Sequence, residues 1–185
     1  MPATPLLRLV VAALATIALA ASCGGDGNGD DTTSPAEWAD GLCSSITTWT
    51  DSLQSTTDSL RSGNLTEESL RSAADDVKSS TETFVDDVKG LGKPDTESGD
   101  RAEELVDGLG NDVDEGAQKI EDTIEGVSDP SGLLSAISVV SGTIQTMSQQ
   151  VSSTLQQLRQ LDPAGDLGQG FQEAESCDVI QSSGG

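Results

Sequence analysis

Histidine and tyrosine are absent from this 185-residue sequence, and its other aromatic residues are two Phe and two Trp. Without histidine the chain has no Ser-His-Asp or Cys-His catalytic group and no imidazole ligand for a metal. Basic residues are also few, with nine Lys and Arg against 32 Asp and Glu, which gives a formal net charge of -23. Nucleic-acid binding requires clustered Lys and Arg that neutralise phosphates, so we expect no nucleic-acid partner.

A long hydrophobic run occurs only near the N-terminus. The run 9–21 follows Arg8 and has thirteen residues. It is too short to span a bilayer of about 30 Å as a helix, but it fits the apolar part of an export signal. Two cleavage sites compete. The sequence Ala-Leu-Ala at 18–20 fits ordinary secretion, whereas Ala-Ala-Ser-Cys at 20–23 resembles a lipobox, in which cleavage precedes a lipid-bearing cysteine.

The number of cysteines favours the lipobox. Lipidation of Cys23 leaves Cys43 and Cys177 to pair, whereas cleavage after Ala20 leaves an exported protein with an odd thiol. We therefore predict a lipoprotein signal peptide at 1–22 and a flexible acidic, Gly-rich tether at 23–33. The predicted location is extracytoplasmic, with the chain anchored to the cell membrane by the lipid on Cys23. Secretion without a lipid and a retained membrane anchor are the alternatives.

Apolar residues beyond the tether recur at spacings of three and four, which predicts four long helices. Ser34 and Thr66 are the predicted caps of the first two helices, and Gly92 with Pro94 ends the second. Thr96 is the predicted cap of the third helix, and the fourth is predicted to run from Asp129 to 161. The predicted apolar face of the fourth helix comprises Leu134, Ile137, Val140, Ile144, Met147, Val151, Leu155, Leu158 and Leu161.

Four helices of this length with short connections can bury their apolar faces in one antiparallel up-down-up-down four-helix bundle. The predicted fold is therefore all-α, with the bundle spanning 34–180, a short C-terminal helical turn around Leu167 and Phe171, and a disordered tail at 181–185. In this topology the end of the fourth helix lies beside the start of the first. The bundle thus places Cys43 near Cys177 and predicts a disulfide between them. Trp38 and Trp49 are expected to fill the core, since they are eleven residues apart and share a helix face.

Charge is unevenly distributed along the predicted helices. Residues 95–129 include thirteen acidic and two basic residues, whereas 131–161 include no acidic residue, and Arg159 is their single charge. An uncharged surface suits close protein contact, because no charged group has to lose its hydration. We define the candidate interaction face on the fourth helix by the polar residues Ser141, Gln145, Ser148, Gln149, Ser152 and Gln156.

Acidic clusters at 75–76, 86–87, 103–104 and 112–115 fall mostly outside the apolar faces, so we interpret them as solvated helix surfaces. We predict no catalytic residue, no metal site and no cofactor. The predicted function is a non-enzymatic structural or protein-interaction module of the bacterial cell envelope, with an envelope protein as its partner. Two alternatives remain open, namely small-molecule or solute binding between the helices and divalent-cation binding by the acidic faces.

Short motifs of this chain also occur in small exported proteins. These are Ala-Glu-Trp at 36–38 with Leu42-Cys43, Leu-Gly-Lys-Pro-Asp-Thr at 91–96, and Leu-Asp-Pro-Ala at 161–164 ahead of Cys177. With these motifs the chain resembles an uncharacterised group of small exported lipoproteins of actinobacteria, which have a Trp-x-x-x-Leu-Cys start and one late Cys. The resemblance implies an exported location and a disulfide, and it implies no activity or catalytic residue.

Overall fold

The computed structural model describes residues 32–62, 66–127 and 129–183, and over these residues the chain is all-α apart from one pair of very short strands. The elements are β1 (Thr32–Thr33), α1 (Pro35–Ser62), α2 (Glu67–Gly90), β2 (Lys93–Pro94), α3 (Gly99–Glu125), α4 (Pro130–Leu161), α5 (Asp166–Glu173) and α6 (Glu175–Ser183). None of the described helices combines the length and the apolar character needed to cross a bilayer. The predicted signal peptide, Cys23 and most of the predicted tether lie outside the described residues.

Three helix starts are capped as the sequence predicts. The Ser34 hydroxyl accepts the Glu37 backbone N–H at 3.4 Å, which caps α1, and it donates to Glu37 Oε2 at 2.6 Å. Thr66 Oγ1 accepts the N–H of Ser69 at 3.1 Å at the start of α2. At the start of α4, one carboxylate oxygen of Asp129 accepts the backbone N–H groups of residues 131 and 132. Local capping chemistry therefore determines where α1, α2 and α4 begin.

The start of α3 differs from the prediction, because the N-cap is Ser98 and not Thr96. β2 pairs in parallel with β1, and the carbonyl of Thr33 accepts the N–H of Asp95 at 2.8 Å. These bonds hold the chain extended past Pro94, so it must complete a turn before the helix can start. Gly99 fits this turn, since a Cβ there would lie 2.3 Å from the carbonyl oxygen of Pro94.

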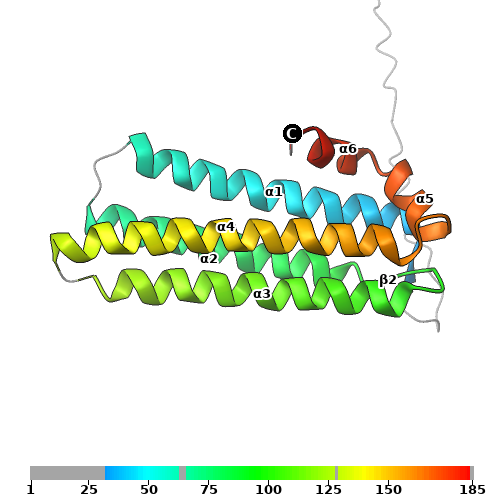
Figure 1. Cartoon of the computed structure of the whole chain (residues 1–185), viewed down its shortest axis with the longest axis horizontal. Helices are drawn as coiled ribbons and strands as arrows, with labels where there is room; N and C mark the ends of the chain where they lie inside the picture. The colour runs from blue at the N-terminus through cyan, green and yellow to red at the C-terminus, as the bar shows by residue number, and fades with distance from the viewer. Residues whose placement is uncertain (1–31, 63–65, 128, 184–185) are drawn as a thin grey trace, which may run out of the picture.

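Successive long helices pack on one another, α1 on α2, α2 on α3, and α3 on α4 (Figure 1). The prediction of packed helices is therefore confirmed, but the closed ring of four is not. Among the described residues, α1 makes its other close helix contacts with α5 and α6, and α4 makes one with α5. The C-terminal segment is longer than the single turn predicted and ends in α6 at Ser183, beyond the predicted domain end at 180. It packs beside α1, where the closed bundle would place α4.

Both tryptophans lie in the core, as predicted. The ring of Trp49 stacks on Phe84 at 5.2 Å between ring centres, and its indole N–H donates to Thr81 Oγ1 at 3.1 Å. The indole N–H of Trp38 donates to the carbonyl of Gly92 at 2.9 Å. Gly92 has a φ of 61°, a left-handed conformation that favours glycine and turns the chain after α2. The two indole groups thus connect α1 to α2 and to the turn that follows it.

The apolar face of α4 agrees with the prediction only in part, since Val140, Met147, Val151, Leu155 and Leu158 are buried as predicted. The buried line of α4 also includes Ala136, Thr143 and Thr154. Leu134 falls off this line and is 70% exposed, while Ile137, Ile144 and Leu161 are only partly buried. Hydropathy alone missed Thr143 and Thr154, because threonine is not an apolar residue. The hydroxyl of Thr143 donates to the carbonyl of Val139 at 2.9 Å, which allows the side chain to be buried without an unpaired donor.

Candidate functional site

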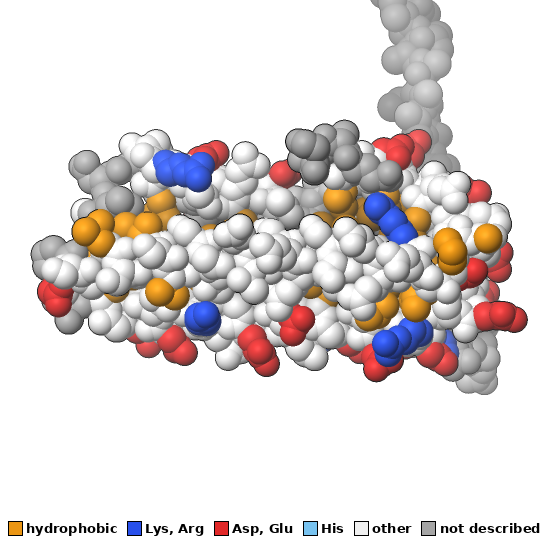
Figure 2. Space-filling view, in the orientation of Figure 1, with side chains coloured by type: hydrophobic (Ala, Val, Ile, Leu, Met, Phe, Trp, Pro, Cys, Tyr) orange, Lys and Arg blue, Asp and Glu red, His pale blue; other side chains and the backbone are white. Residues whose placement is uncertain are grey.

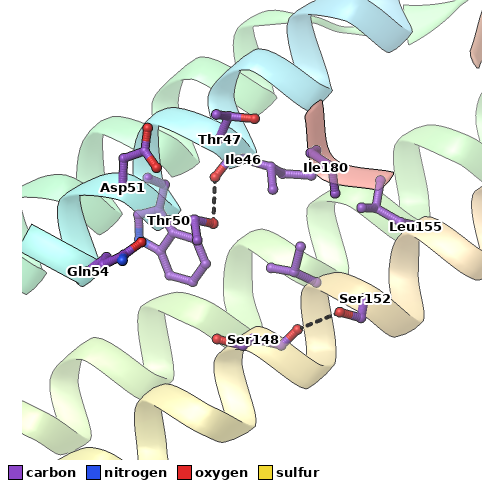
Figure 3. Close-up of a pocket in the computed structure, with 11 residues that line it drawn as sticks. Ile46, Thr47, Thr50, Asp51, Gln54, Ser148, Ser152, Leu155 and Ile180 are labelled. Atoms are coloured by element: carbon purple, nitrogen blue, oxygen red, sulfur yellow. Dashed lines mark hydrogen bonds between the residues drawn. The ribbon is translucent and has the colours of Figure 1, made fainter. Parts of the chain in front are cut away.

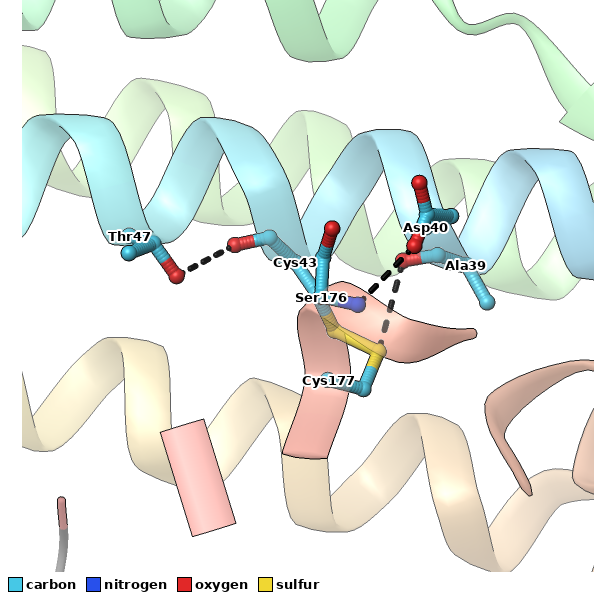
Figure 4. The surroundings of a disulfide bond; sticks show 6 residues. All are labelled: Ala39, Asp40, Cys43, Thr47, Ser176 and Cys177. Atoms are coloured by element: carbon cyan, nitrogen blue, oxygen red, sulfur yellow. Dashed lines mark hydrogen bonds between the residues drawn. A yellow bond between two sulfur atoms is a disulfide. The ribbon is translucent and has the colours of Figure 1, made fainter. Parts of the chain in front are cut away.

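The predicted disulfide is present and joins Cys43 of α1 to Cys177 of α6, with a sequence separation of 134 (Figure 4). Both cysteines are fully buried, and beside them Asp40 Oδ1 accepts the backbone N–H of Ser176 at 3.0 Å. The bridge therefore attaches the C-terminal helix to the beginning of α1. Its burial identifies it as a structural bridge and not a reactive thiol pair.

A surface groove lies between α1 and α4, and we call it the α1–α4 groove. It has a volume of about 390 Å³. Its lining is mixed, with apolar side chains flanked by hydroxyl and amide groups and one carboxylate (Figure 3). The lining residues are Ile46, Thr47, Trp49, Thr50, Asp51 and Gln54 of α1, Ser148, Val151, Ser152 and Leu155 of α4, and Ile180 of α6. The groove exists because α1 and α4 do not pack closely against each other, and α6 covers only part of their seam.

All six residues of the candidate interaction face are exposed on α4. Ser148 and Ser152 also line the α1–α4 groove, so the two features are continuous. Their hydroxyl groups donate to the carbonyls of Ile144 and Ser148 at 3.0 Å, within the helix. The serine oxygens therefore remain available outward as acceptors, without any charge.

The α4 surface differs from its neighbours in charge and in exposed apolar groups. Figure 2 shows it as a band without acidic side chains, while acidic side chains gather along α3 and hydrophobic ones along the seam with α1. The exposed large hydrophobic residues of the described chain are Leu134 and Val139, at 70% and 39%, and both belong to α4. Leu134 is seven residues before Ser141 and therefore extends the candidate interaction face towards the start of the helix.

The acidic clusters lie on the exposed and half-exposed sides of α2 and α3. Within the described ranges, no three acidic or cysteine side chains converge in a way that could hold a metal ion. Both carboxylate oxygens of Glu121 accept from Lys78 Nζ at 2.9 Å. This hydrogen bonding and the negative charge of Glu121 raise the pKa of Lys78. The pair connects α2 to α3 at neutral pH, and its contribution is lost only as the pH rises through the raised pKa of the lysine.

Sequence reasoning identified the candidate interaction face but missed the groove beside it. Trp49 and Ile46 looked like ordinary core residues, and they are 2% exposed at the floor of the groove. The position of Ile180 could have indicated the groove. Ile180 is three residues after Cys177, and that spacing places both residues on one face of a helix. The small residues of α3 leave no open core space at Gly116, where Met147 Cγ would lie 2.7 Å from an added Cβ.

Comparisons of the chain with protein-family models, with curated proteins and with solved structures give no match.

Proposed function

We propose that the protein is a non-enzymatic, lipid-anchored interaction module of the bacterial cell envelope that binds a protein partner through α4. The observation that carries the proposal is the continuity of an uncharged helix face with a partly apolar groove, in a chain whose net charge is -23. Elsewhere on the long helices, a partner would have to desolvate or neutralise carboxylates. On α4 between 131 and 158 no charged group opposes close contact.

The α1–α4 groove supports a helical partner segment. One helix of this chain, α6, already packs on α1 and places Ile180 into the groove. A partner helix that continues along the same seam would bury apolar side chains at spacings of three and four against Val151 and Leu155. Asp51 at the rim would favour a basic residue beside that apolar stripe.

The predicted export and lipid anchor form part of this proposal. A fully buried disulfide supports folding in an oxidising compartment, because cytosolic thiols are kept reduced. The antiparallel up-down-up-down arrangement is the finer proposal for the helices, with α5 and α6 bridging the seam between α1 and α4. We propose the four-helix bundle as the scaffold that holds α4 rigid for binding.

Three glutamates introduced on α4 test the docking surface. In the variant Ser141→Glu, Ser148→Glu and Gln156→Glu, cross-linking to the partner in intact cells is expected to be lost, because each carboxylate would have to be desolvated on binding. The matched control adds the same charge on α1 and α2 through Ser55→Glu, Ser72→Glu and Thr83→Glu, and it should cross-link normally. Equal cross-linking by the two variants would contradict the proposal.

Binding of a small apolar ligand is the second candidate function, and the volume of the α1–α4 groove favours it. About 390 Å³ falls within the range of small-molecule sites. The groove is open to the surface, however, and it lacks converging charged groups that would orient a polar ligand. Saturable uptake of a hydrophobic fluorescent probe that is unaffected by Ser141→Glu and Gln156→Glu, two positions outside the lining of the groove, would favour this candidate over protein docking.

A further inference from the structure

A second cleft lies at the C-terminal end of α4, where α4, α5 and α6 meet, and the proposed docking surface does not use it. Its volume is about 480 Å³. It is lined by Arg159, Pro163, Gly168, Phe171, Gln172 and Asp178. Arg159 is the only basic residue after Lys119 in the whole sequence. The cleft therefore contains the single positive charge of the C-terminal third of the chain.

The guanidinium of Arg159 is positioned by packing and not by a counter-charge. Its central carbon lies 5.8 Å from the ring centre of Phe171. Its Nη2 atom is buried and has no hydrogen-bond acceptor in the described part of the protein. The ion pairs found among those residues do not include Arg159. Buried donors are rarely left unpaired because an unpaired one is costly, and an acceptor supplied by a bound ligand would remove that cost.

Asp178 of α6 is the other charged residue that lines this cleft. The cleft thus presents one positive and one negative group from different helices, and the two do not pair with each other. Phe171 and Pro163 supply an apolar wall between the helices. The amide of Gln172 is held by its hydrogen bond to the carbonyl of Gly168 at 3.1 Å.

We propose that this cleft binds a zwitterion, specifically a free α-amino acid with an apolar side chain. The ligand carboxylate would accept from Arg159, its ammonium would donate to Asp178, and its side chain would lie against Phe171 and Pro163. A ligand without net charge suits this protein, because the field of a chain with net charge -23 opposes the approach of a simple anion.

Three forms of one ligand test the proposal on the unmodified full chain. L-phenylalanine and L-leucine at millimolar concentration are expected to shift the NMR signals of the Arg159 Nε–H and the Phe171 ring in a saturable way. L-phenylalanine amide lacks the carboxylate, and N-acetyl-L-phenylalanine lacks the ammonium. Each derivative is expected to bind at least about tenfold more weakly, because a charged hydrogen-bonding group is left unpaired.

Variants assign the binding to this cleft. Arg159→Gln and Asp178→Asn should each weaken L-phenylalanine binding by at least about tenfold. Lys119→Gln removes the same charge from α3 and should leave binding unchanged. Absence of saturable shifts with both amino acids, or equal binding by the amide and by the free acid, would overturn the proposal. The α4 glutamate variant described above leaves all six lining residues in place, so failure of protein docking and failure of this cleft are distinguishable.

Discussion

At the residue scale, the core depends on a few polar side chains that are buried and paired. Thr81 of α2 is fully buried, and its hydroxyl accepts the indole N–H of Trp49 in α1. The same tryptophan stacks on Phe84. A small residue from α2 thereby allows one of the two Trp side chains of α1 to be buried without leaving its donor unpaired.

Replacing Thr81 by valine tests this pairing. Thr81→Val preserves the volume but leaves the indole N–H without an acceptor, so we expect a loss of about 1 to 3 kcal/mol in the free energy of unfolding. Thr81→Ser keeps the hydroxyl and removes one methyl group, which should cost about 1 kcal/mol. Urea unfolding monitored by tryptophan fluorescence measures both variants. A valine variant as stable as the native protein would show that the hydrogen bond contributes nothing.

At the element scale, α6 lacks the length to be stable alone, and the disulfide holds it against α1. An isolated helix of nine residues is marginal in water. Its attachment uses Cys177, the Ser176–Asp40 hydrogen bond and the side chain of Ile180 in the groove. The bridge therefore determines both the stability of the chain and how much of the α1–α4 groove is covered.

Removal of the bridge should destabilise the fold and release α6 first. For the variant Cys43→Ala with Cys177→Ala we expect a loss of about 3 to 5 kcal/mol, because a bridge across 134 residues strongly restricts the unfolded chain. Hydrogen exchange should show faster exchange in α6 than in α3. If the variant loses less than about 1 kcal/mol and α6 stays equally protected, the bridge is not what holds this helix.

The sequence predicted those elements whose signals are local. Ser34, Thr66 and Asp129 cap helices by contacts within three residues, and all three caps are present. The start of α3 was mispredicted because it depends on pairing between β1 and β2, whose paired residues are 61 positions apart and show no apolar alternation. The open seam between α1 and α4 was also missed. It depends on how a segment with few apolar residues packs after α4, which helical periodicity does not reveal.

The candidate site was also predictable only where its features are local in the sequence. The missing charges of α4 are visible in the sequence, and they identified the six residues that the structure places on its surface. The exposure of Leu134 was not visible, because it depends on which turn of α4 faces α3. The Arg159 cleft requires three helices to meet, and no spacing in the sequence indicates it.

At the scale of the whole molecule, the charge and the proposed lipid anchor together bear on how the protein can act. In a chain with a net charge of -23, α4 is the long helix on which close contact requires no neutralisation of carboxylates. β1 holds the beginning of the described chain against β2, at the end of the helices where α3 begins (Figure 1). The proposed lipid anchor would therefore attach at that end and leave the length of α4 accessible.

Substitution of Cys23 tests the proposed anchor. In the variant Cys23→Ala the thioether cannot form, so we expect the protein to leave the membrane fraction and appear in the soluble exported fraction. Mass measurement of the N-terminal peptide of the native protein should show a diacylglycerol-modified cysteine at 23. An unmodified N-terminus that begins at residue 21 would favour ordinary secretion instead.

Site-specific photo-cross-linking in intact cells tests the central claim most directly. A photoreactive amino acid is placed singly at Gln145 or Gln149 on α4, or, as controls, at Thr83 of α2 or Asp112 of α3, which are also exposed. The account predicts that both α4 positions yield one discrete protein adduct of the same size and that neither control position does. Adducts from α2 or α3 but none from α4 would contradict it.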